Sequence, residues 1–356
     1  MKTTLIIIGG FLGAGKTSLL WETAHELSGN GEKVGLITND QASELVDTTF
    51  LESSAGIVNE VSGSCFCCNF PGFTEAIMHI KDQNEGGIIL AEPVGSCTDL
   101  SATIMQPLKD KYSDDIELKP LTVLADPIKL KEVLEDASSP PSYIIFKQFE
   151  EADIILINKT DLVSESELSD LIKETEKKWP LVKVMTASVK EGKGIAEWFD
   201  TVMNSNSAGT RIVDVDYDIY AEGEAAFGWL NATFTIEKEA DFERLAQSFI
   251  DSLSKRFDDI KANVGHIKFL LKDKEELIIG NITGSGETNT LRKFKRNNTE
   301  RSITVNARVE TDPGTLKKII LEEIDKAFGG LDYKQVALNC LIPGRPEPTY
   351  RYDSII

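Results

Sequence analysis

The chain has 356 residues, 41% of them hydrophobic, which is enough for more than one domain and for a sizeable buried core. Its formal net charge of -20 disfavours bare nucleic acid and anionic membrane surfaces as partners, and it suits cations or a basic protein. No apolar run approaches the roughly 20 residues that a membrane-spanning helix needs, and the N-terminus enters a strand-like segment with no signal-peptide layout.

The first predicted elements are a buried strand, a glycine-rich loop and a helix. Residues 4–8 form a short apolar run, and residues 18–27 have the apolar spacing of a helix. Between them, residues 10–17 fit the pattern G-x-x-x-x-G-K-[ST], which binds phosphate through backbone N–H groups and the helix N-terminus. We expect Lys16 to reach the terminal phosphates and the Thr17 hydroxyl to ligate Mg2+. The expected nucleotide-binding residues here are Gly10, Gly13, Ala14, Gly15, Lys16, Thr17 and Ser18.

Three thiols follow within four residues, at Cys65, Cys67 and Cys68, in a chain with five cysteines. Closely spaced thiolates suit a soft or borderline divalent cation such as Zn2+. Three ligands leave a fourth position open, which suits exchange or delivery of the ion. Two alternatives remain: a closed structural zinc site with a distant fourth ligand such as Cys97 or His79, and a redox pair.

A second buried-strand run, residues 153–157, ends in the tetrad Asn158-Lys159-Thr160-Asp161. This N-K-x-D pattern, at the end of a strand and downstream of a phosphate loop, predicts guanine recognition. The Asp161 carboxylate can accept from N1–H and the exocyclic amine of guanine, a donor pair that adenine lacks. Lys159 would cover the base, and Asn158 would tie this loop to the phosphate loop. Ser188 lies in a segment, residues 186–190, that resembles an S-A-K base-supporting loop, although Val189 interrupts it.

Together these residues resemble the CobW/HypB/UreG group of GTPases, and CobW-like proteins most closely. The resemblance implies that Glu92, which follows an apolar run at residues 86–91 and begins an E-x-x-G pattern with Gly95, holds Mg2+ or orients the attacking water. It also places Asp40 in the first switch, as a second-sphere Mg2+ group. The implied catalytic residues are therefore Lys16, Glu92 and Asp40, and the implied Mg2+ ligands are Thr17 and Glu92.

The chain departs from the family pattern in two respects. Ser64 stands before Cys65, where the family usually has glycine, and the chain has only three histidines, His25, His79 and His266. A histidine-rich metal store is therefore not expected, and any metal must rest mainly on the thiolates.

Strands alternate with helices to about residue 203, which predicts a parallel sheet with ligands beyond the carboxyl ends of its strands. We expect an α/β P-loop GTPase domain over residues 1–203, a linker over 204–227, and a smaller C-terminal α+β domain over 228–356. Within the linker, residues 214–220 alternate in period two and predict a connecting strand. In the second domain we expect two helices on one face of a sheet. We also expect a basic patch at residues 292–296 and Arg301, as a solvated loop or as a docking site for an acidic partner or the GTPase domain.

The sequence thus predicts a cytoplasmic, Mg2+-dependent GTPase that binds and delivers a divalent metal of the zinc or cobalt class. Clustered cysteines that are expected to stay reduced favour the reducing cytoplasm as the location. The expected partner is a client metalloenzyme or a corrinoid protein, and a homodimer is possible. One alternative is a GTP-dependent activator or insertion chaperone for a corrinoid enzyme. The other is a GTP switch whose cysteines form a purely structural zinc site.

Overall fold

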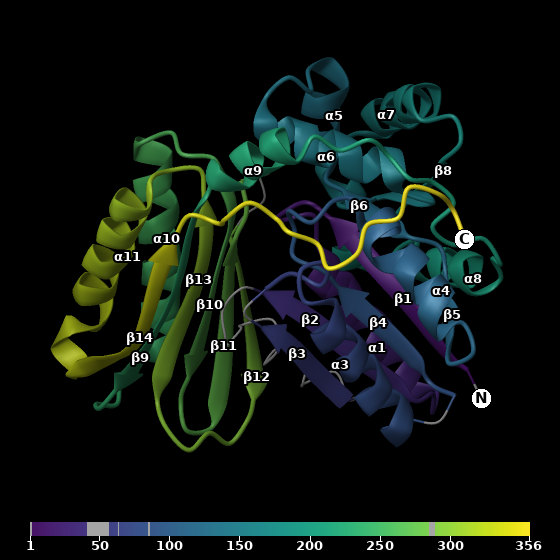
Figure 1. Cartoon of the computed structure of the whole chain (residues 1–356). Coiled ribbons are helices and arrows are strands. Elements are labelled where there is room, and N and C mark those ends of the chain that lie inside the picture. The colour runs from purple at the N-terminus through teal and green to yellow at the C-terminus, as the bar shows by residue number, and fades with distance from the viewer. Residues whose placement is uncertain (1, 41–56, 63, 85, 285–288) are drawn as a thin grey trace. The chain divides into compact units, whose positions relative to one another are not determined.

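The computed structural model describes residues 2–40, 57–62, 64–84, 86–284 and 289–356. The chain divides into two compact units (Figure 1). Among the described residues, unit 1 runs through Gly223 and also includes Arg345–Ile356, whereas unit 2 is Glu224–Gly344. The last twelve residues of the chain therefore pack with the first unit, although the sequence alone suggested a C-terminal domain over 228–356.

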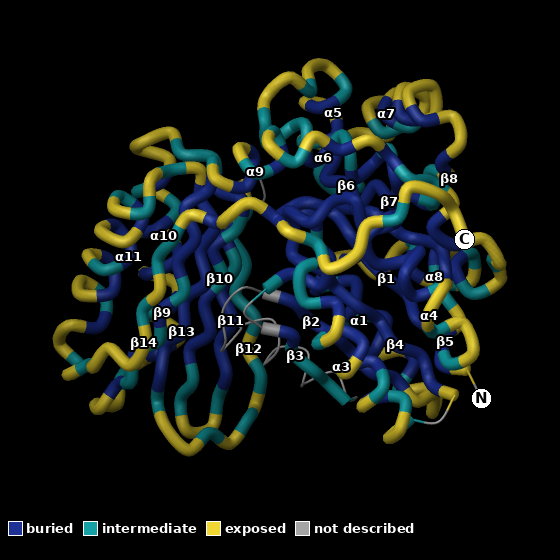
Figure 2. The backbone as a smooth tube through the Cα atoms, in the orientation of Figure 1, coloured by how far each residue is buried: buried dark blue, intermediate teal, exposed yellow. Residues whose placement is uncertain are grey.

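Unit 1 is built on a parallel sheet with strand order β3-β2-β4-β1-β6-β7-β8, and β5 pairs with β1. The inner strands read as continuous apolar runs because helices bury both faces of such a sheet, and Figure 2 shows them in the buried colour. The strands are β1 (Thr3–Gly10), β2 (Val34–Asp40), β3 (Ile57–Ser62), β4 (Ile88–Glu92), β5 (Ile116–Leu118), β6 (Thr122–Ala125), β7 (Ile154–Ile157) and β8 (Lys183–Thr186).

Crossover helices connect these strands. Apolar side chains of α1 and α8 share one core with residues of β1, β4 and β7, including Ile6 and Trp198. Trp198 also donates from Nε1 to the Thr122 hydroxyl at 3.0 Å, which satisfies the indole N–H inside the core. The helices are α1 (Lys16–Gly29), α3 (Phe70–Gln83), the π-helix η2 (Ser101–Met105), α4 (Gln106–Tyr112), α5 (Pro127–Glu135), α6 (Pro140–Glu151), α7 (Glu165–Lys178), α8 (Ile195–Met203) and α9 (Tyr217–Ala225).

The strand predicted at residues 214–220 is wrong, because the helix α9 begins at Tyr217. The Asp216 side chain accepts hydrogen bonds from the backbone N–H groups of Asp218, at 2.9 Å, and Ile219, at 3.2 Å. This is the capping geometry that starts a helix. Tyr220 is then buried on the inner side of the helix. Local capping by a carboxylate therefore outweighs the period-two alternation.

Unit 2 is a six-stranded antiparallel sheet, in the order β12-β11-β10-β13-β9-β14, with α10 and α11 packed on it. Both helices start at the aspartates that cap them, Asp241 and Asp312. This arrangement confirms the expected α+β domain. Its elements are β9 (Gly228–Ile236), α10 (Phe242–Asp259), β10 (Val264–Lys272), β11 (Glu276–Ile282), β12 (Thr290–Lys295), β13 (Ser302–Val309), α11 (Pro313–Phe328), η5 (Gly329–Leu331) and β14 (Tyr333–Leu341).

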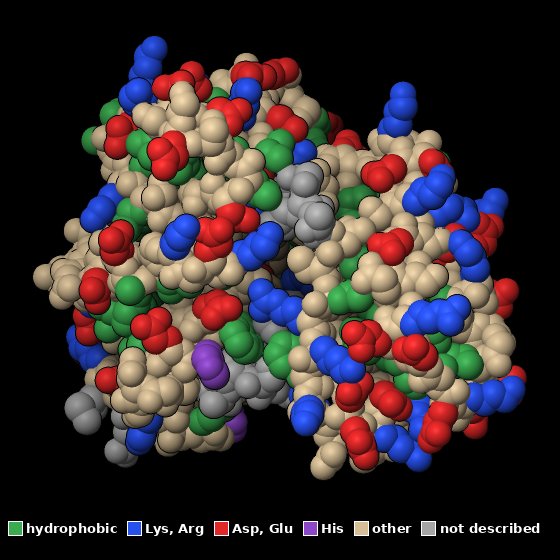
Figure 3. Space-filling model, turned by 180° about the vertical axis from the view of Figure 1, so that it is seen from behind, with side chains coloured by type: hydrophobic (Ala, Val, Ile, Leu, Met, Phe, Trp, Pro, Cys, Tyr) green, Lys and Arg blue, Asp and Glu red, His purple; other side chains and the backbone are tan. Residues whose placement is uncertain are grey.

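The predicted basic loop at residues 292–296 is instead mostly the edge strand β12, paired with β11. Its Lys293 forms ion pairs with Glu243 and Glu276, both at 3.0 Å. Basic side chains are common on edge strands, where they discourage pairing with other chains. On the face shown in Figure 3, acidic and basic side chains are likewise mixed across the surface.

Candidate nucleotide and metal site

The phosphate loop lies between β1 and α1, at the carboxyl end of the sheet. Gly15 precedes the helix with φ 100°, a left-handed conformation that favours glycine. A Cβ at this position would collide with the side-chain amide of Asn158. The first residue of α1 is Lys16. The lysine and the backbone N–H groups of the helix N-terminus can therefore bind the same phosphates.

The lysine, threonine and glutamate that the sequence singled out lie together and are buried. Lys16 Nζ is 3.8 Å from Glu92 Oε1, and the Thr17 hydroxyl donates to the same carboxylate oxygen at 3.1 Å. A hydroxyl and a carboxylate oxygen this close are hard ligands of the kind that Mg2+ prefers. The donor set therefore fits a Mg2+ ion.

The predicted base-reading loop follows β7. Asn158 donates from Nδ2 to Ala14 O at 2.9 Å, which ties this loop to the phosphate loop as expected, and accepts from Val189 N at 3.1 Å. Lys159 adopts φ 58°, and its Nζ lies 3.0 Å from Asp126 Oδ2. No sequence motif singled out Asp126. Its place before Pro127 at the end of an apolar run was an available signal, because an aspartate there caps a helix.

Asp161 is held ready as an acceptor. The buried Ser188 donates from its hydroxyl to Asp161 Oδ1 at 2.7 Å, and Lys190 Nζ lies 3.6 Å from Oδ2. Desolvation raises the pKa of Asp161, but the Ser188 hydrogen bond and the Lys190 charge outweigh it and lower that pKa overall. The carboxylate is therefore ionised at neutral pH, as a hydrogen-bond acceptor for guanine must be.

The cysteine loop lies directly before α3. Cys65 Sγ is 2.9 Å from Cys67 Sγ, Cys67 Sγ is 3.8 Å from Cys68 Sγ, and all three sulfur atoms lie within 4.8 Å of one another. None of the three forms a disulfide. Hydrogen bonds from the Cys67 thiol and its neighbours lower the pKa of Cys65, whereas contact with Cys65 raises the pKa of Cys68 to about 11. One thiolate is thus stabilised by neighbouring thiols, which readies the cluster for a metal.

Asn39, at the end of β2, anchors the cysteine loop to the sheet. Its Nδ2 donates to Val61 O and Ser64 O, both at 2.8 Å, and its Oδ1 accepts from Phe66 N at 2.9 Å. The sequence pointed to this segment but favoured its neighbour Asp40 as the functional residue. The backbone of Asp40 pairs with that of Ser62 at the end of the strand, and its side chain lies outside the described part of the structure.

The tail of the chain, residues 345–356, supports the same loop from the opposite end of the sequence. Thr349 donates from its backbone N to Cys67 O at 2.8 Å and from its hydroxyl to Cys68 O at 3.1 Å. The ring of Tyr350 stacks edge-on against Phe70 at 5.3 Å. No sequence pattern marked these residues, because the tail lacks periodicity.

The segment after β4 carries Gly95 and Cys97, and a side chain of α6 binds the carbonyls of both residues. Gln148, buried on that helix, donates from Nε2 to Gly95 O at 3.0 Å and to Cys97 O at 2.8 Å. Gly95 also lies against the phosphate loop, because a Cβ there would be 3.1 Å from Lys16 Nζ. No sequence pattern marked Gln148.

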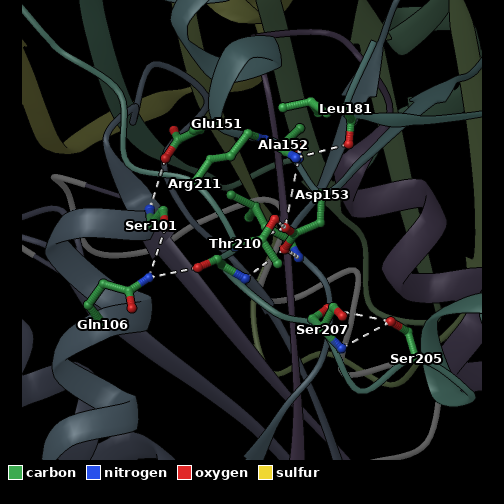
Figure 4. Close-up of polar contacts among 12 residues, drawn as sticks. Ser101, Gln106, Glu151, Ala152, Asp153, Leu181, Ser205, Ser207, Thr210 and Arg211 are labelled. Carbon is green, nitrogen blue, oxygen red and sulfur yellow. Dashed lines mark hydrogen bonds and ion pairs between the residues drawn. The ribbon is translucent and has the colours of Figure 1, made fainter. Parts of the chain in front are cut away.

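Further along this segment, Ser101 donates from its backbone N to Glu151 at 2.9 Å (Figure 4). Gln106 donates to the Gly209 carbonyl at 2.8 Å, and Asp153 accepts from the backbone N–H groups of Gly209 and Thr210 at 2.7 and 3.0 Å. These contacts fix the predicted linker against unit 1. Burial, followed by the charge of Asp99, raises the pKa of Glu151 to about 8.

Comparison with known proteins points in the same direction. A family model described as CobW/HypB/UreG, nucleotide-binding domain, matches residues 4–186. The zinc-regulated GTPase metalloprotein activator 1 of Schizosaccharomyces pombe is 31% identical over 173 residues, covering 46% of this chain and 40% of its own. The zinc chaperone YjiA of Escherichia coli is 27% identical over 170 residues, covering 45% and 50%. The chain thus spans about half the length of the curated relatives it matches.

Two solved structures are also similar. HypB from Archaeoglobus fulgidus has a TM-score of 0.40 at 22% identity, over 56% of this chain and 89% of its own. The zinc-bound YjiA GTPase from E. coli has a TM-score of 0.39 at 16% identity, over 93% and 99%. Because both scores are below 0.5, the fold assignment rests on the strand order itself. No helix in the described part of the chain is long and apolar enough to cross a membrane.

Proposed function

Because the chain belongs to the CobW/HypB/UreG family, we propose that it is a Mg2+-dependent GTPase whose nucleotide site is coupled to a thiolate site that binds and hands over a divalent metal ion. One observation carries this proposal. Three thiols within 4.8 Å of one another are anchored through Asn39 to a strand of the sheet that also carries the phosphate loop. A change at the carboxyl ends of these strands can thus reach the thiols through hydrogen bonds.

The chain's own residues would act as follows. The backbone of residues 10–17 and the Lys16 ammonium bind the phosphates, and the charge that develops there during hydrolysis is offset by Lys16. Thr17 and Glu92 would hold Mg2+, which when bound neutralises further phosphate charge. Asp161 would bind the guanine edge, with Ser188 and Asn158 holding its loop in place.

Zinc is the metal we favour, because thiolates suit it and because the relatives are named zinc chaperones or zinc-regulated activators. The cargo is proposed to be a metal ion rather than a corrinoid, since a cluster of three thiols suits a bare ion. The proposed partner is a client metalloenzyme, and a homodimer is a further proposal. The reducing cytoplasm, which keeps such thiols free, is the proposed location.

Reciprocal affinity measurements test the coupling. If the sites are linked, Mg2+-GTP must change the affinity for Zn2+, and Zn2+ must change the affinity for GTP by the same factor, about 5- to 150-fold in typical linked systems. Changing all three thiols, as C65S/C67S/C68S, should remove metal binding and metal-dependent hydrolysis. The matched control is Cys340→Ser, which removes a thiol from unit 2.

Circular dichroism of both variants shows whether they are folded. If Zn2+ affinity is the same in the GTP, GDP and nucleotide-free states, the delivery function is wrong. A structural zinc site in a GTP switch then takes its place, as it does if the triple variant unfolds while the control stays folded.

A further inference from the structure

A fourth thiol lies beside the cysteine cluster. Cys97 is 1% exposed, and its side chain interacts with the thiols of both Cys65 and Cys67, although its sulfur atom lies outside the group of three whose sulfur atoms are all within 4.8 Å of one another. It belongs to a different loop, the segment that follows β4 (Ile88–Glu92). The cluster is therefore assembled from two loops that are distant in sequence, and the second loop is the one that begins at Glu92.

Zinc bound by cysteines is almost always four-coordinate and tetrahedral when the site is closed. The three thiols of the cysteine loop supply three positions, and Cys97 is a buried thiol next to two of them. His79, the other fourth ligand considered from the sequence, is exposed on α3 and hydrogen-bonds to Gln83 at 2.9 Å. Of the two candidates, Cys97 is therefore the better fourth ligand, and His79 is not placed to bind the ion.

We propose that Cys97 is the fourth metal ligand, and that the segment 92–97 is the part through which the nucleotide opens and closes the metal site. With Cys97 bound, the ion is enclosed by four thiolates. With Cys97 withdrawn, the ion keeps the three thiolates of the cysteine loop and gains an open position for transfer. Each cysteine that is protonated in the free site gives up its proton when it binds the metal and takes one back on release, whereas Cys65 is already a thiolate.

The segment between Glu92 and Cys97 is placed to carry this change. Glu92 shares its carboxylate with Thr17 and Lys16, and Gly95 lies against Lys16, so both are at the phosphate loop. Cys97 donates from its backbone N to Val94 O at 2.9 Å, and this hydrogen bond closes a tight turn over residues 94–97. Gln148 holds the carbonyls of Gly95 and Cys97 together. A displacement of Gly95 toward or away from a phosphate would therefore move the Cys97 backbone with it.

This inference rests on the proposed function, because it assumes that the three-thiol cluster binds the ion. The test uses the full-length protein loaded with Zn2+ alone, without nucleotide, and counts sulfur ligands by X-ray absorption. We expect four sulfur ligands in the wild type, three in Cys97→Ser, and four in the control Cys340→Ser. Co2+ in place of Zn2+ gives an independent readout, since its visible absorption should lose intensity when one thiolate is lost.

The outcomes distinguish the two claims. If the wild type and Cys97→Ser have the same number of sulfur ligands, the fourth-ligand assignment is overturned while metal binding by the cysteine loop survives. If neither protein binds Zn2+ through sulfur, the proposed function itself fails.

A second measurement tests the route of coupling. The ratio of Zn2+ affinities with Mg2+-GTP and with Mg2+-GDP should differ from one in the wild type and in Cys340→Ser, and fall toward one in Cys97→Ser. A ratio unchanged by Cys97→Ser would overturn the role of this segment in opening the site.

Discussion

The nucleotide site and the thiol site lie at the same edge of the unit 1 sheet, but they are held in different ways. The phosphate and base loops are short turns between a strand and a helix, and they brace each other through Asn158. The cysteine loop instead depends on residues from β2, from the segment after β4 and from the tail of the chain. The loops of the first site therefore support each other, whereas the second site depends on residues outside its own loop and can respond to changes there. The three predictions below test this contrast.

The largest effect should come from Lys16→Ala, which removes the charge aimed at the phosphates. Hydrolysis of GTP should fall by about 100- to 1,000-fold, the range seen when one charge-stabilising group is removed. The fold should persist because the surrounding loop is held by backbone geometry. Lys173→Ala, at an exposed ion pair on α7, is the control and should hydrolyse GTP at the wild-type rate. Turnover by Lys16→Ala equal to that of the control would contradict the phosphate-loop assignment.

A smaller effect is expected from Asp161→Asn. A charged acceptor that meets two donors of guanine contributes about 1.5–3 kcal/mol, so GTP affinity should fall by about 10- to 100-fold. The amide can donate to the extra carbonyl of xanthine, and XTP affinity should rise. Competition binding of both nucleotides measures the change, with Asp170→Asn as an exposed control. Tight GTP binding without any gain for XTP would show that another residue reads the base.

The smallest effect concerns Glu151, which holds the far part of the segment that carries Cys97. Its pKa is raised to about 8 in the folded protein, so between pH 4.5 and 8 the folded state holds a proton that the unfolded state releases. The free energy of unfolding should therefore decrease as the pH rises through this window and level off above it. Glu151→Gln keeps a neutral acceptor for Ser101 N and should flatten this dependence. Denaturant titrations at pH 5, 7 and 9 would reveal it, and equal slopes in both proteins would contradict the raised pKa.

The loops of the proposed nucleotide site could be located from the sequence because each motif is a short stretch. Residues 10–17 carry the glycines, the lysine and the threonine together, and Asn158 was expected to reach the phosphate loop, as it does. The strand expected at residues 214–220 failed for a local reason, the capping by Asp216.

The supports of the thiol site were harder to predict. Gln148 reads as an ordinary helix residue, and only the packing of α6 brings it to the carbonyls of Gly95 and Cys97. Thr349 lies in an aperiodic tail, and its hydrogen bonds to the cysteine loop span almost the whole sequence. Such contacts depend on tertiary structure, which leaves no pattern in a single chain.

The chain returns to unit 1 at residues 345–356, so the segment in between affects how strongly this tail binds. Residues 224–344 leave from α9 and come back through a tail anchored by Arg351, which bonds to Asp99 at 2.7 Å, and by Ile356. Unit 2 is thus a tether between two points on unit 1, and the tail binds at an effective concentration set by that tether. An unfolded tether of this length would dilute the tail, although each doubling of a flexible loop costs only about 0.6 kcal/mol. Anything that stabilises unit 2 would therefore increase the time that Thr349 spends on the cysteine loop.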